Sequence, residues 1–226
     1  ALGVMVGAPL LAIAGARLLR HQLLILLMGL FAVGNIASAI AADYDLLLLC
    51  RFIAGMPHGA YFGVIALVAS SLAPANGRAK AVSRVMLGIA FAMLFGSPLA
   101  TRLGQLTDWR YVFGLVGLLA IFTLMMIFAF LPRNPDEQRS SALGELRSLL
   151  NLNIWVALAI GSVGFAGMFC VFSYLGPTML NVTKTDPAWI PVGLGMLGLG
   201  GIIGNIVGGW LFDRAGYHSL GIILAW

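Results

Sequence analysis

Long apolar runs separated by short polar turns dominate the pattern along this chain. A partial span is predicted at Ala1–Ala16, and a last one begins at Ser219. Between them the pattern predicts six complete membrane spans, over Gln22–Ala42, Leu46–Ala73, Ala81–Leu103, Trp109–Leu131, Ile154–Leu180 and Ala188–Phe212. We therefore predict an all-α polytopic membrane protein, and we expect the chain to be a fragment of a longer one.

The basic residues set the expected orientation. Turns on one side of the alternating spans hold nine of them: Arg17, Arg20, Arg78, Lys80, Arg84, Arg133, Arg139, Arg147 and Arg214. The other side holds Arg102, Arg110 and Lys184, with the acidic residues Asp43, Asp45, Asp108 and Asp186. By the positive-inside rule the first set faces the cytoplasm.

Composition excludes several other classes of protein. A chain that is 61% hydrophobic and 9% charged is no soluble domain, and its net charge of +5 is spread over short turns, which excludes nucleic-acid binding. Cys50 and Cys170 lie in apolar runs without metal-ligand spacing, so we expect no metal site and no cofactor. No nucleophile elbow, zinc-protease motif, phosphate loop or pair of membrane carboxylates occurs, so we expect no enzyme.

The longest connection, residues 132–153, divides the chain. Its leucines repeat at helical spacing, at Leu143, Leu146, Leu149 and Leu150, which predicts a short amphipathic helix on the membrane surface; a solvated linker is the alternative. We expect one membrane bundle over residues 1–131 and the start of a second over 154–226. A weak repeat supports this division, because Arg17 aligns with Arg214 about 200 residues later, as in transporters built from parallel repeats.

Two polar residues share one face of the span Leu46–Ala73. Arg51 and His58 are seven residues apart, which places them roughly 10 Å apart along the axis on nearly the same side. An arginine at this depth costs at least ~2.5 kcal/mol on insertion, so it should face protein or water. Glycines at positions 55, 59 and 63 permit another backbone to come close. We predict that this face borders a polar cavity between the two bundles.

Each candidate side chain has a structural alternative. Arg51 binds substrate or a proton-linked carboxylate, or it ties the helix to helix-end carbonyls or a neighbouring helix. His58 relays protons or donates to a carbonyl inside the bundle. Tyr174 faces substrate, or it packs or contacts lipid as the aromatic residues Phe165, Phe169 and Phe172 are expected to do.

Several motifs resemble those of the major facilitator superfamily. The loop signature of that family is similar to Gly209-x-x-x-Asp213-Arg214-x-Gly216, and its helix 4 signature to Arg51-x-x-x-Gly55-x-x-x-Gly59. The glycine-proline signature of its antiporters resembles Gly88, Gly96, Pro98 and Gly104. The strings PHGAYFGV, GSPLATRLGQ, DWRYVF and FSYLGP look most like the arabinose-type sugar-efflux permeases of its drug and sugar:proton antiporter branch.

The resemblance implies a helix bundle covering about helices 2 to 9 of twelve, in the inner (plasma) membrane. It implies export of a small organic solute by proton antiport through alternating access, by a monomer whose other partners are the lipid bilayer and protons. Two positions depart from the pattern: Ala16 replaces the acid of the first loop signature, and Leu19 replaces its glycine. No Asp or Glu lies within a predicted span, so proton coupling is implied by the family alone.

The cytoplasmic turns are expected to control access to the cavity. The residues concerned are Arg17, Arg20, Gly209, Asp213, Arg214 and Gly216. Asp213 and Arg214 are expected to form a charge latch with the neighbouring bundle, and a solvated turn is the alternative. Pro98 is expected to break the hydrogen-bond ladder of its helix, giving a bend or gate, or plain packing. A uniporter, an uptake symporter of the same fold and a non-transporting membrane scaffold or sensor remain alternatives for the whole protein.

Overall fold

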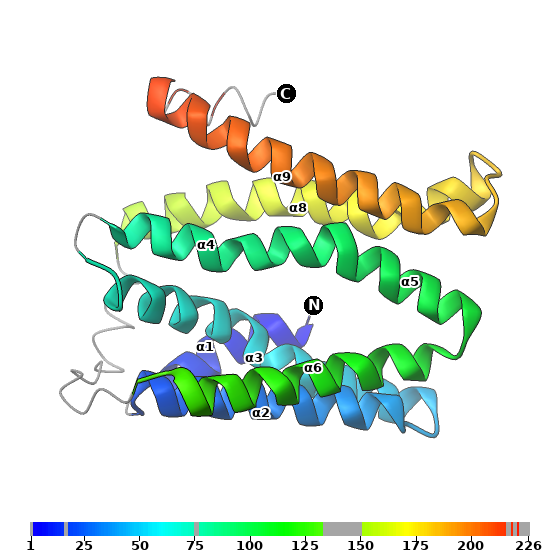
Figure 1. Cartoon of the computed structure of the whole chain (residues 1–226), viewed down its shortest axis with the longest axis horizontal. Helices are drawn as coiled ribbons and strands as arrows, with labels where there is room; N and C mark the ends of the chain where they lie inside the picture. The colour runs from blue at the N-terminus through cyan, green and yellow to red at the C-terminus, as the bar shows by residue number, and fades with distance from the viewer. Residues whose placement is uncertain are drawn as a thin grey trace. The chain divides into compact units, whose positions relative to one another are not determined.

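In the computed structural model all regular elements of the described residues are helices (Figure 1). The structure describes residues 2–15, 18–74, 77–132, 151–215, 218 and 221. In chain order the helices are α1 (Leu2–Gly15), α2 (Arg20–Ala39), α3 (Tyr44–Ser71), α4 (Arg78–Phe91), η2 (Ala92–Gly96), α5 (Ser97–Leu106), α6 (Trp109–Phe130), α8 (Leu152–Asn181), η3 (Pro187–Trp189) and α9 (Ile190–Ala215).

The predicted spans agree with these helices to within a few residues. Six helical stretches are long and apolar enough to cross a membrane, with α4, η2 and α5 together forming one of them. The prediction of an all-α polytopic membrane protein is therefore confirmed. The amphipathic helix predicted within residues 132–153 falls almost wholly outside the described residues, and the last partial span does as well.

Aspartates begin three helices on the side predicted to face away from the cytoplasm. The backbone N–H of Leu46 donates to Asp43 Oδ1 at 2.8 Å, which fixes the start of α3. The side chain of Asp108 accepts a hydrogen bond from the backbone N–H of Arg110 at the start of α6. In the same way, the side chain of Asp186 accepts from the backbone N–H of Ala188 at the start of η3. Each carboxylate satisfies a backbone donor that the first helical turn leaves unpaired.

The first compact unit comprises residues 1–85 and 103–151. Its central element is α2, which packs against α3 on one side and α6 on another, while α1 packs against α3 (Figure 1). Leu24 and Leu27 of α2 are almost completely buried. Gly34 lets α2 approach α3 closely, because a Cβ there would lie 2.8 Å from the Cα of Ala54.

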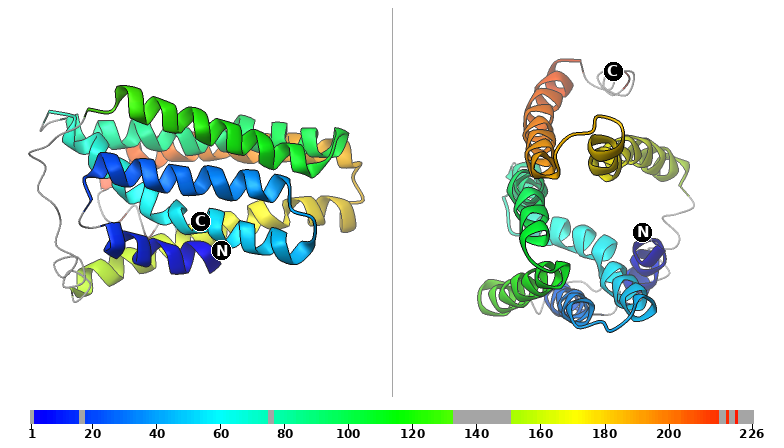
Figure 2. Two further views of the ribbon diagram at one scale, coloured as in Figure 1. Left: turned by 90° about the horizontal axis from the view of Figure 1, so that it is seen from below. Right: turned by 90° about the vertical axis from the view of Figure 1, so that its right-hand side faces the viewer.

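The second compact unit comprises residues 86–102 and the chain from 152 onward. Within it α9 packs against α8 and against η2, which is a short π-helical segment (Figure 2). The contact with η2 is close, since a Cβ on Gly198 would lie 2.6 Å from the Cα of Leu94. The boundaries predicted for the two membrane bundles of the whole protein stay a prediction.

Candidate functional site

The arginine within α3 is held by the neighbouring helix. Arg51 Nη1 donates to Asn35 Oδ1 on α2 at 2.8 Å. Asn35 is only 1% exposed, and its own amide donates to the carbonyl of Phe31 at 2.8 Å. The asparagine is thus fixed by its helix and presents its oxygen to the guanidinium, which is a charge-assisted bond.

A third helix contacts the same guanidinium. Arg51 Cζ lies 4.6 Å from the ring centroid of Phe113 on α6, in a cation–π arrangement. One side chain thereby joins α2, α3 and α6. The tie to a neighbouring helix, one of the two expected roles of Arg51, is present in the structure.

Arg51 also borders open space. It lines a pocket of about 540 Å3 between α1 and the first turns of α3, together with Asp45, Phe52, Leu48, Leu49, Leu2 and Gly3. No ion pair joins Arg51 to Asp45 among the described residues. Arg51 and Asp45 thus line one pocket without an ion pair between them, and the substrate role of Arg51 stays a prediction.

His58 also faces α2. It lines a smaller pocket of about 190 Å3 with Met28 and Phe31 of α2, and its ring meets Phe62 edge-on with centroids 4.9 Å apart. The described residues offer His58 no hydrogen-bond partner. Arg51 and His58 thus share the α2-facing side of α3, as their spacing predicts; whether this side faces the centre of the whole protein stays a prediction.

The glycines of α3 bring α1 close. A Cβ on Gly59 would lie 2.7 Å from the Cβ of Ala8, and one on Gly55 would lie 3.4 Å from the backbone nitrogen of Val4. Gly63 has no neighbour within 4 Å. The close approach expected from Gly55 and Gly59 is therefore observed, with α1 as the approaching helix.

The antiporter-type motif contains a distortion of the helix. The N–H of Ser97 bonds to the carbonyl of Ala92, five residues back, and the π-helical segment ends just before Pro98. Proline has no N–H to give to the carbonyl four residues earlier, so the normal ladder cannot continue there. The expected break at Pro98 is thus present as a wide turn. A Cβ added at Gly88 would meet no atom within 4 Å, whereas one added at Gly104 would lie 3.6 Å from Val112 Cγ2.

The remaining predicted site residues are only partly described. Arg20 begins α2, and Tyr174 lies on α8 with 65% of its surface exposed. The last turns of α9 contain Gly209, Asp213 and Arg214, whose side chains lie outside the described structure, as do Arg17 and Gly216 altogether. The charge latch stays a prediction.

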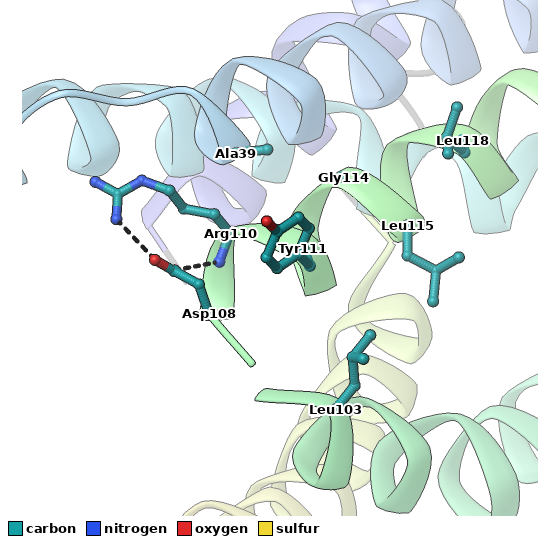
Figure 3. A pocket seen from close by; sticks show the side chains of 8 residues that line it. All are labelled: Ala39, Leu103, Asp108, Arg110, Tyr111, Gly114, Leu115 and Leu118. Atoms are coloured by element: carbon teal, nitrogen blue, oxygen red, sulfur yellow. Dashed lines mark hydrogen bonds and ion pairs between the residues drawn. The ribbon is translucent and has the colours of Figure 1, made fainter. Parts of the chain in front are cut away.

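Sequence reasoning missed the pocket shown in Figure 3. It has a volume of about 600 Å3 and is lined by Ala39, Leu103, Asp108, Arg110, Tyr111, Gly114, Leu115 and Leu118. At its edge Arg110 Nη2 donates to the carbonyl of Ala41 at 3.1 Å, and the guanidinium lies 4.4 Å from the ring centroid of Trp109. The adjacent charged and aromatic residues of the string DWRYVF were the available signal.

Asn35 was missed as well. It lies in the apolar run of α2, about one turn before the helix ends, and an amide inside a membrane span is itself a functional signal. Among the described residues no group of three or more His, Cys, Asp or Glu side chains could hold a metal ion.

Comparisons with known proteins identify the class. The profile described as Major Facilitator Superfamily matches residues 1–225. The inner membrane transport protein YdhP of Escherichia coli K12 is 36% identical over 95% of this chain and 55% of its own length. A "Probable sugar efflux transporter" of Helicobacter acinonychis is 28% identical over 93% of this chain and 54% of its own.

A comparison with solved structures finds a similar fold. The crystal structure of a D-xylose-proton symporter superposes with a TM-score of 0.69 at 18% identity, covering 94% of this chain and 56% of the symporter. The chain belongs to the Major Facilitator Superfamily. It is a multi-pass inner membrane protein that spans about half the length of the curated relatives it matches, and the resemblance to the sugar- and drug-efflux permeases of this family is confirmed.

Proposed function

We propose that the whole protein exports a small organic solute, such as a sugar, a sugar derivative or a drug, in exchange for protons. The observation that carries this proposal is the Arg51–Asn35 pair, a charge held at membrane depth beside a pocket. A membrane arginine is costly and marks solute or proton pathways. The relative named as a sugar efflux transporter supports this solute class and direction.

In the proposed mechanism, a sugar or an acidic group meets the outer side of Arg51 while Asn35 and Phe113 hold the guanidinium in place. Planar guanidinium groups bind carboxylates in a forked geometry and hydroxyl oxygens singly. His58 lies seven residues further along the same face and can carry a proton. The two bundles then rock about this site and expose it alternately to either side of the membrane.

The wide turn before Pro98 supports a hinge in this cycle. A π-helical segment lacks part of the regular ladder, and Gly198 allows α9 to lie directly on its backbone. We propose that α9 slides against η2 during the exchange of states, and that the halves 1–131 and 154–226, joined by residues 132–153, move as bodies. A monomer suffices for this motion, and no catalysed reaction is proposed.

An uptake symporter and a uniporter are the second candidates, and the similar fold of the D-xylose-proton symporter favours the first of these. The test is a solute screen with the full-length protein in liposomes under an imposed pH gradient. Export by antiport predicts that sugars or drugs accumulate against their gradient only while the pH gradient lasts. Equal transport without the gradient would contradict proton antiport and favour a uniporter.

A further inference from the structure

The pocket at the start of α6, drawn in Figure 3, takes no part in the proposed transport mechanism. Its volume of about 600 Å3 falls within the range of small-molecule sites, roughly 300–1,000 Å3. Its described lining belongs entirely to the first unit, at the end of α2, the end of α5 and the first turns of α6. These helix ends lie on the side of the membrane predicted to face away from the cytoplasm.

One end of this pocket is polar and the rest of its wall is apolar. Asp108 and Arg110 lie at the polar end, where α6 begins, and the leucines lie on the other side of Tyr111 (Figure 3). At ~1.5 Å per residue, Leu115 and Leu118 lie roughly 8 Å and 12 Å further along α6 than Arg110. Charges at the membrane surface with an apolar wall running inward match the layout of a phospholipid.

The pocket is accessible at headgroup depth. Tyr111, Leu115 and Leu118 are all exposed, and so is Trp109, which adjoins the charged end. Trp and Tyr side chains gather where a membrane protein meets the headgroups, so these two aromatic residues place the charged end at that level. The exposed leucines extend from there toward the acyl chains.

The polar end presents an acid and a base together. Arg110 Nη1 lies 3.5 Å from Asp108 Oδ2, and the two side chains are 42% and 47% exposed. Arg110 Nη2 donates to the Ala41 carbonyl, and Asp108 Oδ1 accepts from the Arg110 backbone N–H. Among the described residues these bonds leave guanidinium donors and carboxylate lone pairs unused. Because the two charges cancel, the pair favours a ligand that carries both charges over a simple anion.

We propose that this pocket binds a phospholipid whose zwitterionic headgroup ends in a primary amine. The phosphate accepts from Arg110, the ammonium donates to Asp108, and one acyl chain lies along Leu115 and Leu118. A primary ammonium has N–H donors for the carboxylate, which the quaternary amine of phosphatidylcholine lacks. The acidic phosphatidylglycerol offers no cation to Asp108 and is repelled by it. The pocket should therefore prefer phosphatidylethanolamine to both.

Native mass spectrometry of the full-length protein, with the three lipids carrying identical acyl chains, measures this preference. Wild type should bind phosphatidylethanolamine about fivefold more tightly than either other lipid, a modest factor because the charged pair is exposed. Asp108→Asn keeps the helix cap, since asparagine caps as well as aspartate, but it removes the negative charge. This variant should prefer phosphatidylglycerol instead, because Arg110 then lacks its acid.

Asp43→Asn is the matched control. Asp43 caps α3 on the same side of the membrane but lies outside the described lining of the pocket, so the preference should stay that of wild type. Leu115→Trp fills the exposed apolar wall and keeps the charged pair, so it should weaken the binding of all three lipids severalfold.

Equal binding of the three lipids by wild type overturns the proposal. So does a folded Asp108→Asn variant that keeps the wild-type preference, or a folded Leu115→Trp variant that binds phosphatidylethanolamine as tightly as wild type. If Asp108→Asn fails to fold, the wild-type preference and Leu115→Trp still decide.

Discussion

A single arginine side chain links three helices of this protein. Its amide partner on α2 has almost no exposed surface, and a phenylalanine on α6 covers the guanidinium. Arg51 also lines the pocket beside α1. In the proposed mechanism, the stability of the bundle and the transport of solute therefore both depend on this hydrogen bond.

Substituting Asn35, the hydrogen-bond partner of Arg51, should lower both the stability of the protein and its transport rate. Asn35→Ala removes the acceptor and is expected to lower the free energy of unfolding by roughly 1–2 kcal/mol, because hydrogen bonds within membrane bundles are worth about that much. Transport should fall as well, since the guanidinium loses its orientation. Thermal unfolding in detergent and solute flux in liposomes measure the two effects.

The matched control is Ser38→Ala, one turn along the same helix. Ser38 is fully buried, and within the described part of the chain its hydroxyl bonds only to the carbonyl of Gly34 at 2.7 Å, so the change leaves Arg51 untouched. It should lower stability slightly and leave flux unchanged. Equal losses of flux in both variants would show that Asn35 acts through general packing and not through Arg51.

The side chains of the site could be predicted from sequence only in part. The cost of burying a charge singled out Arg51, and helical periodicity placed His58 on the same face. The contacts of Arg51 could not be predicted, because they depend on the register between helices, which hydropathy does not encode. Asn35 is 16 residues away on an adjacent helix, and Phe113 is 62 positions further along the chain.

At the scale of helices, small residues decide how closely the elements pack. Gly34 lies against the backbone of Ala54, and Gly117 of α6 lies against Ile36. In a membrane, packing and hydrogen bonds replace most of the hydrophobic driving force between helices. A methyl group added at such a contact should therefore be more damaging than one added on an open face.

Gly34→Ala tests this directly. The added Cβ would lie 2.8 Å from three atoms of Ala54, so α2 and α3 must separate, at an expected cost of about 1–3 kcal/mol. Gly29→Ala, on the same helix, meets nothing within 4 Å and should be neutral or stabilise by up to ~1 kcal/mol through helix propensity. Thermal unfolding of the two variants measures the difference, and equal melting temperatures would contradict the packing described here.

A second pair of glycines tests the contact with the π-helical segment. Gly198→Ala places a methyl group on the backbone of Leu94, whereas Gly200→Ala, two residues on, points into open space. If α9 must slide on η2, the first variant should lower the transport rate severalfold, and the second should not. Solute flux at matched protein density measures this. A normal rate in a folded Gly198→Ala variant would remove η2 from the mechanism.

Spans could be predicted well because their signal is local. An apolar run of about twenty residues has few alternatives to a membrane helix, and α3 begins two residues earlier than predicted because Asp43 caps it. The wide turn near Pro98 could be predicted only as a break. Its form depends on the approach of Gly198 from a helix about 100 residues later.

For the whole molecule, family membership defines the fold, and the proposed direction of transport and its coupling are what remain to be measured. The three candidate mechanisms differ in the sign of proton movement that accompanies the solute. Antiport moves protons against the solute, symport moves them with it, and a uniporter moves none.

The most direct measurement follows the pH inside liposomes that contain the full-length protein, when a sugar or drug found in the screen is added outside without an imposed gradient. Antiport predicts that the lumen becomes alkaline as solute enters, and that Arg51→Gln abolishes both the solute flux and the pH change. Acidification of the lumen, or solute entry with no pH change, would contradict the account.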